Sequence, residues 1–376
     1  MSESNKMVLL GAGASVEAGI PAAVGLTEKV INHFRLHSRT GQVLRYVYGG
    51  LMMGKGARGE DPLQGINVED LIEAINQLAD RKNLQIAPFI ALWNEGVTAF
   101  QERDARDNLM SAFKELSELA RGSEAERAMK HLSIDYTLEN YLHGETQDFQ
   151  YARESVIREL IHMLWIEDSE QVSYFKPLVE QGRDQSFTIA TLNYDNTVEL
   201  ACMALGIPCT TGLDDWNALE GFPEPATGID LLKLHGSVTW QKINKRHHRT
   251  PEVPLPRMQV QLQRRDGIKR GYDPAIIFGA GNKLTAEGPF LELLLAFRER
   301  LDQHDELIVV GYSFGDEHIN DALWRWLNRS QDHKVTVIDF SEDKSQIPFK
   351  GIFRYMMDRY TFYLDGAADG LVEVFE

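Results

Sequence analysis

The sequence predicts an α/β protein in which a Rossmann-like, doubly wound parallel sheet carries a large all-helical insertion. Two observations predict the sheet: short apolar runs recur along the chain, and several end in Gly or a polar residue before a helical stretch. The insertion is predicted because apolar residues between about Thr27 and Lys176 recur at three- and four-residue spacing. We therefore expect residues 1–35 and 184–376 to form the sheet domain and residues 36–183 a helical subdomain.

The expected elements follow in order along the chain. An apolar strand at residues 7–10 ends at Gly11, and a glycine turn then leads into a helical pattern. Helical spacing in the insertion is clearest in residues 68–78, 89–100, 109–119 and 156–165. Beyond Asp184, short apolar runs predict buried parallel strands at residues 187–192, 231–234, 275–278, 307–310 and 335–340. Helices are expected at residues 197–205, 288–301 and 317–327, because parallel strands need crossover connections.

Composition bounds the class of protein. Of the 376 residues, 43% are hydrophobic and 25% are charged, which is typical of a folded chain without disordered segments. No apolar run reaches the ~18 residues of a membrane span, so we expect no membrane segment and a cytoplasmic location. The two cysteines, Cys202 and Cys209, exclude a four-cysteine zinc site and fit a reducing compartment.

Charge argues against a nucleic-acid-binding surface. The formal net charge is −17, whereas non-specific affinity for DNA comes from Lys and Arg side chains. Residues 241–270 depart from this balance, because they carry nine Lys or Arg against Glu252 and Asp266. We expect a solvated basic loop there, with a contact to a partner or second subunit as the alternative.

The first motif is Gly-Ala-Gly-Ala-Ser at residues 11–15. Glycines allow a sharp turn that brings backbone N–H groups close to a pyrophosphate, and the following helix dipole favours the anion. The third glycine of the dehydrogenase fingerprint would fall at Val16 and is absent, which argues against hydride transfer. On its own, the motif also fits a tight strand-to-helix turn.

Polar side chains follow two of the expected strands. Asn193 and Asp195 come after residues 187–192, and His235 comes after residues 231–234, so all three fall at carboxyl ends, where α/β sheets bind ligands. An amide can hold a ribose hydroxyl or an attacking water, and an imidazole can accept a proton near neutral pH. Taken singly, Asn193 also fits a helix-capping turn residue and His235 a buried core imidazole.

A second glycine turn follows the strand expected at residues 307–310. It begins at Gly311, and Ser313 and Asp316 could hold the hydroxyls of an adenosine ribose, although Asp316 also fits a helix cap. A Gly-Ala-Gly sequence also recurs at residues 279–281 after an apolar run.

Together, residues 11–15, the following Ala-Gly-Ile-Pro at 18–21, residues 191–195 and residues 234–236 resemble the nicotinamide-dinucleotide site of the sirtuin family. The resemblance implies that Asn193 orients water and ribose, that Asp195 recognises the nicotinamide amide and that His235 is the general base. The expected dinucleotide contacts are Gly11, Ala12, Gly13, Ser15, Ile20, Pro21, Asp195, Gly279, Gly311, Ser313 and Asp316.

Three departures from sirtuin deacylases favour water as the acceptor. Residues 22–24 replace the usual Asp-Phe-Arg, Leu192 stands where Gln is usual, and the four-cysteine zinc ribbon is missing. The stretch from Gly311 resembles the sirtuin-like proteins of bacterial anti-phage defence. That resemblance implies an NAD+ glycohydrolase that releases nicotinamide and ADP-ribose, needs no metal and acts by depleting NAD+.

Regulation of such an enzyme is expected to come from outside the chain. The resemblance implies a HerA-like ATPase partner, and the need for regulation also favours a homo-oligomer. Charge and hydropathy predict no direct contact to nucleic acid or membrane. Two other classes stay open at this point. One is a deacylase or ADP-ribosyltransferase with a protein acceptor, and the other is a non-catalytic module that binds NAD+ or ADP-ribose.

Overall fold

A computed structural model describes residues 5–79, 148–213, 222–243, 259–262, 274–277, 289–340 and 357–376. The chain divides into two compact units. Residues 1–26 and 160–376 form the sheet unit, and residues 27–159 form the helical unit. The expected helices at residues 89–100 and 109–119 lie outside the described residues, so the predicted insertion with bounds 36–183 stays a prediction.

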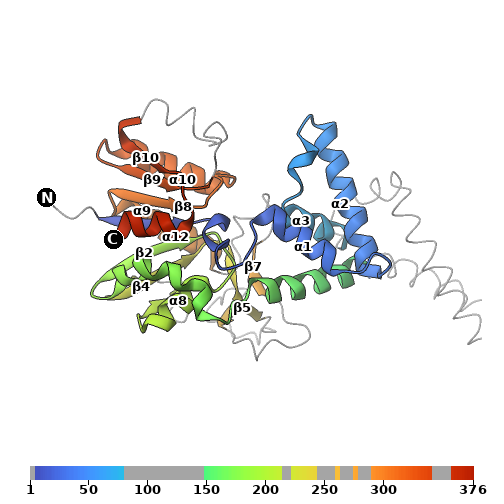
Figure 1. The fold of residues 1–376 in the computed structure, drawn as a ribbon, viewed down its shortest axis with the longest axis horizontal. Helices are drawn as coiled ribbons and strands as arrows, with labels where there is room; N and C mark the ends of the chain where they lie inside the picture. The colour runs from blue at the N-terminus through green and yellow to red at the C-terminus, as the bar shows by residue number, and fades with distance from the viewer. Residues whose placement is uncertain are drawn as a thin grey trace, which may run out of the picture. The chain divides into compact units, whose positions relative to one another are not determined.

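The sheet unit is built on a seven-stranded parallel sheet, which confirms the predicted α/β fold (Figure 1). Its strand order is β10-β9-β8-β1-β2-β4-β3. The strands are β1 (Lys6–Leu10), β2 (Ser186–Thr191), β3 (Cys209–Thr210), β4 (Gly228–Lys233), β8 (Glu306–Val310), β9 (Lys334–Ile338) and β10 (Tyr360–Tyr363). Because these strands are parallel, the carboxyl ends of β1, β2, β4 and β8 lie along one edge, and the strand order reverses beside β1.

Both faces of the sheet are buried, which explains the continuous apolar runs. Met7 and Leu9 of β1 belong to a core cluster with residues of the helices α9 (Phe290–Asp302) and α10 (Glu317–Arg329). On the opposite face, the backbone of Gly370 in α12 (Ala367–Phe375) approaches the side chain of Ile338. Because successive side chains alternate between faces, a strand covered on both sides needs apolar residues throughout.

Several helices begin and end close to their expected bounds. The helix α8 spans Thr197–Leu205 as predicted and ends at Gly206, whose φ of 65° provides a left-handed cap. Helix α9 begins two residues after its expected start, and α10 begins where predicted, with Asp316 as its N-cap. Between residues 169 and 182, the chain forms short helices: η4 (Ser169–Phe175), α7 (Lys176–Val179) and η5 (Glu180–Gly182).

Two expectations after His235 were wrong in part. Residues 274–276 form β7 (Pro274–Ile276), which pairs antiparallel with β5 (Gly236–Ile243) in a separate three-stranded sheet rather than joining the parallel sheet. The third strand of that sheet is β6 (Gln259–Leu262), also antiparallel to β5, so the stretch at 241–270 is not wholly a loop. An apolar run indicates a buried strand, but it does not indicate the direction of its partner.

The helical unit contains α2 (Arg39–Ala57), η2 (Pro62–Gln64), α3 (Val68–Ala79), most of α1 (Ala23–His33) and residues 148–159 of a helix that is described from residue 148 to residue 164. Arg45 secures the end of α1, because its guanidinium donates to the carbonyls of Ile31 and Phe34 at 3.3 Å. Across the unit, His33 Nδ1 lies 3.0 Å from Glu159 Oε1.

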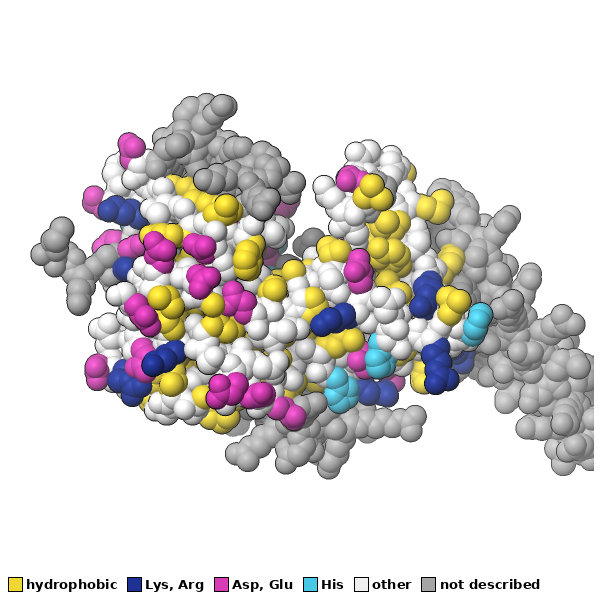
Figure 2. Space-filling view, in the orientation of Figure 1, with side chains coloured by type: hydrophobic (Ala, Val, Ile, Leu, Met, Phe, Trp, Pro, Cys, Tyr) yellow, Lys and Arg dark blue, Asp and Glu magenta, His cyan; other side chains and the backbone are white. Residues whose placement is uncertain are grey.

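The described residues show where acidic side chains lie on the surface and how apolar the helices are. Figure 2 shows acidic side chains scattered over the visible face of the sheet unit, as the net charge of −17 leads one to expect. Within the described ranges, no helix is both long and apolar enough to cross a membrane.

Candidate functional site

The glycine turn after β1 is locked against the turn after β8. The N–H of Gly11 donates to Val310 O at 2.9 Å, and the N–H of Gly13 donates to Gly311 O at 2.8 Å. A Cβ on Gly11 would lie 2.5 Å from the Cα of Tyr312, and one on Gly13 would lie 2.6 Å from the Cα of Gly311. The glycines are therefore required where two backbones meet, because a side chain on either turn would separate them.

The turn continues as a short helix, η1 (Ala12–Ser15), that other segments hold in place. Tyr174 donates its hydroxyl to Ala14 O at 2.7 Å, and Gln171 donates to Ala18 O at 3.2 Å. Burial, together with the negative charge of Asp195, raises the pKa of the Tyr174 phenol well above its ordinary value of 10.0. Tyr174 is therefore a neutral donor at physiological pH.

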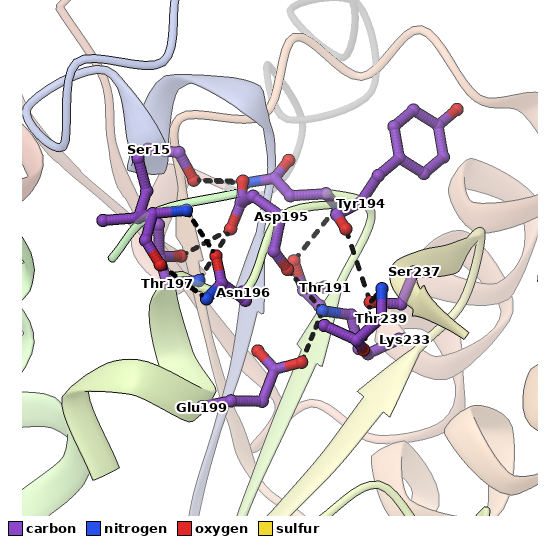
Figure 3. Close-up of polar contacts among 12 residues, drawn as sticks. Ser15, Thr191, Tyr194, Asp195, Asn196, Thr197, Glu199, Lys233, Ser237 and Thr239 are labelled. Carbon is purple, nitrogen blue, oxygen red and sulfur yellow. Dashed lines mark hydrogen bonds and ion pairs between the residues drawn. The ribbon is translucent and has the colours of Figure 1, made fainter. Parts of the chain in front are cut away.

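Ser15 joins the first and second motifs in one buried network (Figure 3). Asn193 Nδ2 donates to Gly11 O at 2.8 Å and to Ser15 Oγ at 3.0 Å, and Ser15 Oγ donates to Asp195 Oδ2 at 2.8 Å. Because Gly11 O only accepts, the amide nitrogen of Asn193 must face it. Both amide hydrogens are thereby used, and Oδ1 is left as the acceptor that Asn193 can offer to a water or a ribose hydroxyl.

Asp195 is buried, and its carboxylate is held by neighbouring donors. Oδ2 accepts from the Ser15 hydroxyl, and Oδ1 accepts from the backbone N–H of Thr197 at 3.1 Å and from its hydroxyl at 2.6 Å. These bonds also satisfy the start of α8, as an aspartate before a helix commonly does. A carboxylate can accept about four hydrogen bonds, so Oδ2 retains capacity for one further donor such as a carboxamide.

Lys233 is a residue of the site that sequence reasoning missed. It is the last residue of β4, its exposed fraction is 0%, and its ammonium donates to the carbonyl oxygen of Asp195 and, at 2.7 Å, to Glu199 Oε1 (Figure 3). The signal was a lysine within the apolar run 231–234, since a lysine is almost never fully buried without partners. Lys233 therefore fixes the segment that carries Asp195 against β4.

His235 follows β4 in a two-residue turn and pairs with Asp316 in the glycine turn that begins at Gly311. Its Nε2 lies 3.0 Å from Asp316 Oδ2, and the two side chains are 7% and 5% exposed. Its Nδ1 is buried and has no hydrogen-bond partner among the described residues. Gly236, with φ of 84°, is required because a Cβ there would collide with the Ala275 carbonyl of β7.

The remaining predicted residues are placed as follows. Ile20 is buried, and its N–H donates to Ser15 O at 3.2 Å, while Pro21 is half-buried. Ala12 and Ser313 are exposed, and Gly311 adopts a φ of 60° against the first turn. Gly279 lies outside the described residues. No group of three metal-ligating side chains occurs in the described ranges.

A family described as "SIR2-like domain" matches residues 188–350 of this chain. The matched segment includes Asn193, Asp195, His235 and Asp316, while the glycine turn at 11–15 precedes it. For the segment that it covers, the match agrees with the resemblance drawn from the motifs. No curated protein matches the chain in sequence.

Solved structures of Sir2 proteins align with the chain at low identity. A triple mutant of a Sir2 homologue with 2′-O-acetyl-ADP-ribose aligns at 14% identity and a TM-score of 0.44, over 99% of this chain and 91% of the other. A point mutant of a Sir2 homologue with ADP-ribose gives 13% and 0.43 over 99% and 91%. A Sir2 homologue in complex with NAD gives 14% and 0.36 over 99% and 89%. The fold assignment rests on the strand order above rather than on these scores.

Proposed function

We propose that this protein hydrolyses the N-ribosyl bond of NAD+ and releases nicotinamide and ADP-ribose. One observation carries the proposal: the motifs at 11–15, 193–195 and 234–236 meet at the carboxyl ends of the adjacent strands β1, β2 and β4. That edge of a doubly wound sheet is where such folds bind nucleotides. The family match over residues 188–350 supports the same class of site.

Each residue has a role that its contacts support. Asn193 Oδ1 would accept from the attacking water or a ribose hydroxyl, because Nδ2 is already bonded to protein. Asp195 Oδ2 would accept from the nicotinamide carboxamide. The water oxygen bonds to C1′, the C1′–N bond breaks with its electron pair going to nicotinamide, and the proton of the water passes to His235. The leaving nitrogen starts as a cation, so departure needs no metal, and preorganised dipoles stabilise the ribosyl cation.

The residue before Asn193 supports hydrolysis over transfer to a peptide. Leu192 is 9% exposed, and its N–H continues the sheet by donating to Leu10 O at 2.9 Å. An apolar side chain there provides no polar group to steer a ribosyl intermediate toward an acyl oxygen. Water is then the acceptor that the site itself can orient.

The test compares NAD+ turnover by the purified protein with turnover by Asn193→Ala and His235→Ala, using chromatography of nicotinamide and ADP-ribose. We expect His235→Ala to lose about 10²- to 10⁴-fold in rate, the range for removal of a general base, and Asn193→Ala to lose rate because the water is no longer oriented. Asn328→Ala and His37→Ala, which change the same residue types at exposed positions, should retain the wild-type rate. Wild-type protein that binds NAD+ without releasing nicotinamide would overturn hydrolysis and leave a binding module.

Product analysis also separates hydrolysis from transfer. ADP-ribose bound to protein would indicate an ADP-ribosyltransferase, and O-acyl-ADP-ribose formed with an acylated peptide would indicate a deacylase. Free ADP-ribose alone supports the proposal.

We further propose a cytoplasmic defence effector that depletes NAD+, functions as a homo-oligomer and is controlled by a HerA-like ATPase. An enzyme that destroys NAD+ needs such control to spare its host. Scattering-based mass measurement with and without the ATPase tests the assembly. NAD+ measured in phage-infected cells, with the His235→Ala variant as control, tests the defence role.

A further inference from the structure

The contact between His235 and Asp316 joins two motifs that lie 81 residues apart in the sequence. The sequence predicts different tasks for these residues: proton transfer for the imidazole, and either a contact to the adenosine ribose or a helix cap for the carboxylate. The structure brings Nε2 of His235 and Oδ2 of Asp316 to 3.0 Å in a buried setting.

Asp316 is itself held rigidly. Its Oδ1 accepts from the N–H groups of His318 at 3.0 Å and Ile319 at 3.3 Å, which makes it the N-cap of α10. Its own N–H donates to the Tyr312 hydroxyl oxygen at 3.0 Å. The two N–H groups of the first turn of α10 therefore hold Oδ1 in place. One oxygen serves the helix, and the other is fixed toward the imidazole.

A carboxylate can only accept, so the nitrogen that faces it must carry the proton. In a neutral imidazole, the hydrogen bond to Asp316 therefore selects the Nε2–H form, and the lone pair lies on Nδ1. Nδ1 is the ring atom that is buried without a partner among the described residues. A buried ring nitrogen left without a hydrogen bond needs an explanation, and a role in proton transfer provides one.

We propose that Asp316 is the positioning residue of His235, which fixes the imidazole with Nε2 protonated and Nδ1 free to accept a proton. Its catalytic consequence rests on the proposed NAD+ hydrolysis. Asp316 would thus act through His235 rather than through contact with the ribose, and its helix cap provides the rigidity that this requires.

The decisive variant is Asp316→Asn, examined by ¹⁵N-resolved spectroscopy of the histidine rings and by kinetics. Asparagine caps helices as well as aspartate does, so α10 should persist. Its amide then donates to Nε2 and forces the proton onto Nδ1, which removes the base. We expect the ring signal absent from His235→Ala to switch from the Nε2–H to the Nδ1–H pattern, and kcat to fall about 10²-fold or more.

Two further variants are compared with Asp316→Asn: one is a matched control, and the other removes the acceptor that faces Nε2. Glu317→Gln makes the same carboxylate-to-amide change at the neighbouring exposed position and should keep the wild-type ring signal and kcat. Asp316→Ser retains a capping oxygen but removes the acceptor that faces Nε2, so its His235 signal should show both proton forms and its kcat should also fall.

The outcomes separate the positioning role of Asp316 from the proposed function. An unchanged His235 signal in Asp316→Asn overturns the positioning role. A raised KM with unchanged kcat also overturns it, because that result would assign Asp316 to the ribose. If the wild-type protein hydrolyses no NAD+, the proposed function fails, while the ring signals still decide whether Asp316 sets the proton position on His235.

Discussion

Lys233 is a buried charge that positions residues of the site and is not expected to contact the substrate. Its ammonium bonds to the Asp195 carbonyl and the Glu199 carboxylate, and no part of it is exposed. Desolvating an ammonium is costly, so its retention depends on both partners. The residue therefore ties the position of the segment 193–195 to the end of β4.

We predict that Lys233→Met destabilises the protein by about 3 kcal/mol, because the Glu199 carboxylate and the Asp195 carbonyl lose their partner. Urea unfolding measures this change. The double variant Lys233→Met/Glu199→Met should recover part of the loss, because it leaves no unpaired carboxylate. If the double variant is destabilised by the sum of the losses measured for Lys233→Met alone and Glu199→Met alone, the ion pair does not explain the burial of Lys233.

Asp230 is predicted to make the stability of the folded protein depend on pH. Burial raises its pKa above the ordinary value of 3.8, and the bond from Arg300 at 2.9 Å offsets this only in part. A carboxyl with a raised folded-state pKa binds its proton more tightly in the folded protein. Its contribution to stability is therefore fully present below pH 3.8 and is lost as pH rises through the folded-state pKa.

The measurement is the free energy of unfolding of wild type minus that of Asp230→Asn at a series of pH values. We expect this difference to fall as pH rises from 3.8. The exposed change Asp321→Asn controls for net charge. A difference that grows with pH would mean that the bond from Arg300 outweighs burial.

At the scale of elements, the site depends on two turns that pack backbone against backbone. We predict that Gly311→Ala destabilises the protein by ~3 kcal/mol or more, since its φ is 60° and a Cβ would collide with Gly13 and Ala14. Thermal unfolding and NAD+ affinity should both decline. Gly315→Ala in the same loop should change little, because the nearest atom to its Cβ is Ser313 Oγ at 3.6 Å.

If Gly311→Ala and Gly315→Ala lower the unfolding temperature equally, the loop after β8, rather than its contact with the turn after β1, determines stability. The variant Gly13→Ala distinguishes two reasons for glycine in the first motif. Contact with a phosphate alone would leave the stability of the ligand-free Gly13→Ala protein unchanged, whereas the contact with the backbone of Gly311 predicts a loss.

At the scale of the whole molecule, β1, β2, β4, β8 and β9 and the helices α8, α9 and α10 were predictable because their signals are local, whereas the edge strands β3 and β10 were not predicted. The strand at 7–10 and the helix at 197–205 are marked by apolar runs and a terminal glycine, and the structure places them there. The carboxyl ends of successive parallel strands necessarily share an edge, so Asn193 and His235 were predictable neighbours of the glycine turn.

The parts of the fold and site that were not predicted depend on contacts between segments far apart in the sequence. The pairing of β5 with β7 and the bond between His235 and Asp316 each join segments tens of residues apart. Lys233 was marked by its apolar surroundings, but its partners follow from the start of α8. Gly11 and Gly13 were identified correctly as a turn, yet the backbone that requires them belongs to the turn at Gly311.

The interlocked turns after β1 and β8 also limit how this site can be transplanted or can diverge. Residues 11–13 cannot be grafted alone onto another scaffold, because the surface that shapes them is the backbone at Gly311. A working graft must carry both strands in register. By the same reasoning, inherited changes at Gly13 and Gly311 should be correlated across related genes, because a side chain gained at either position displaces the other turn.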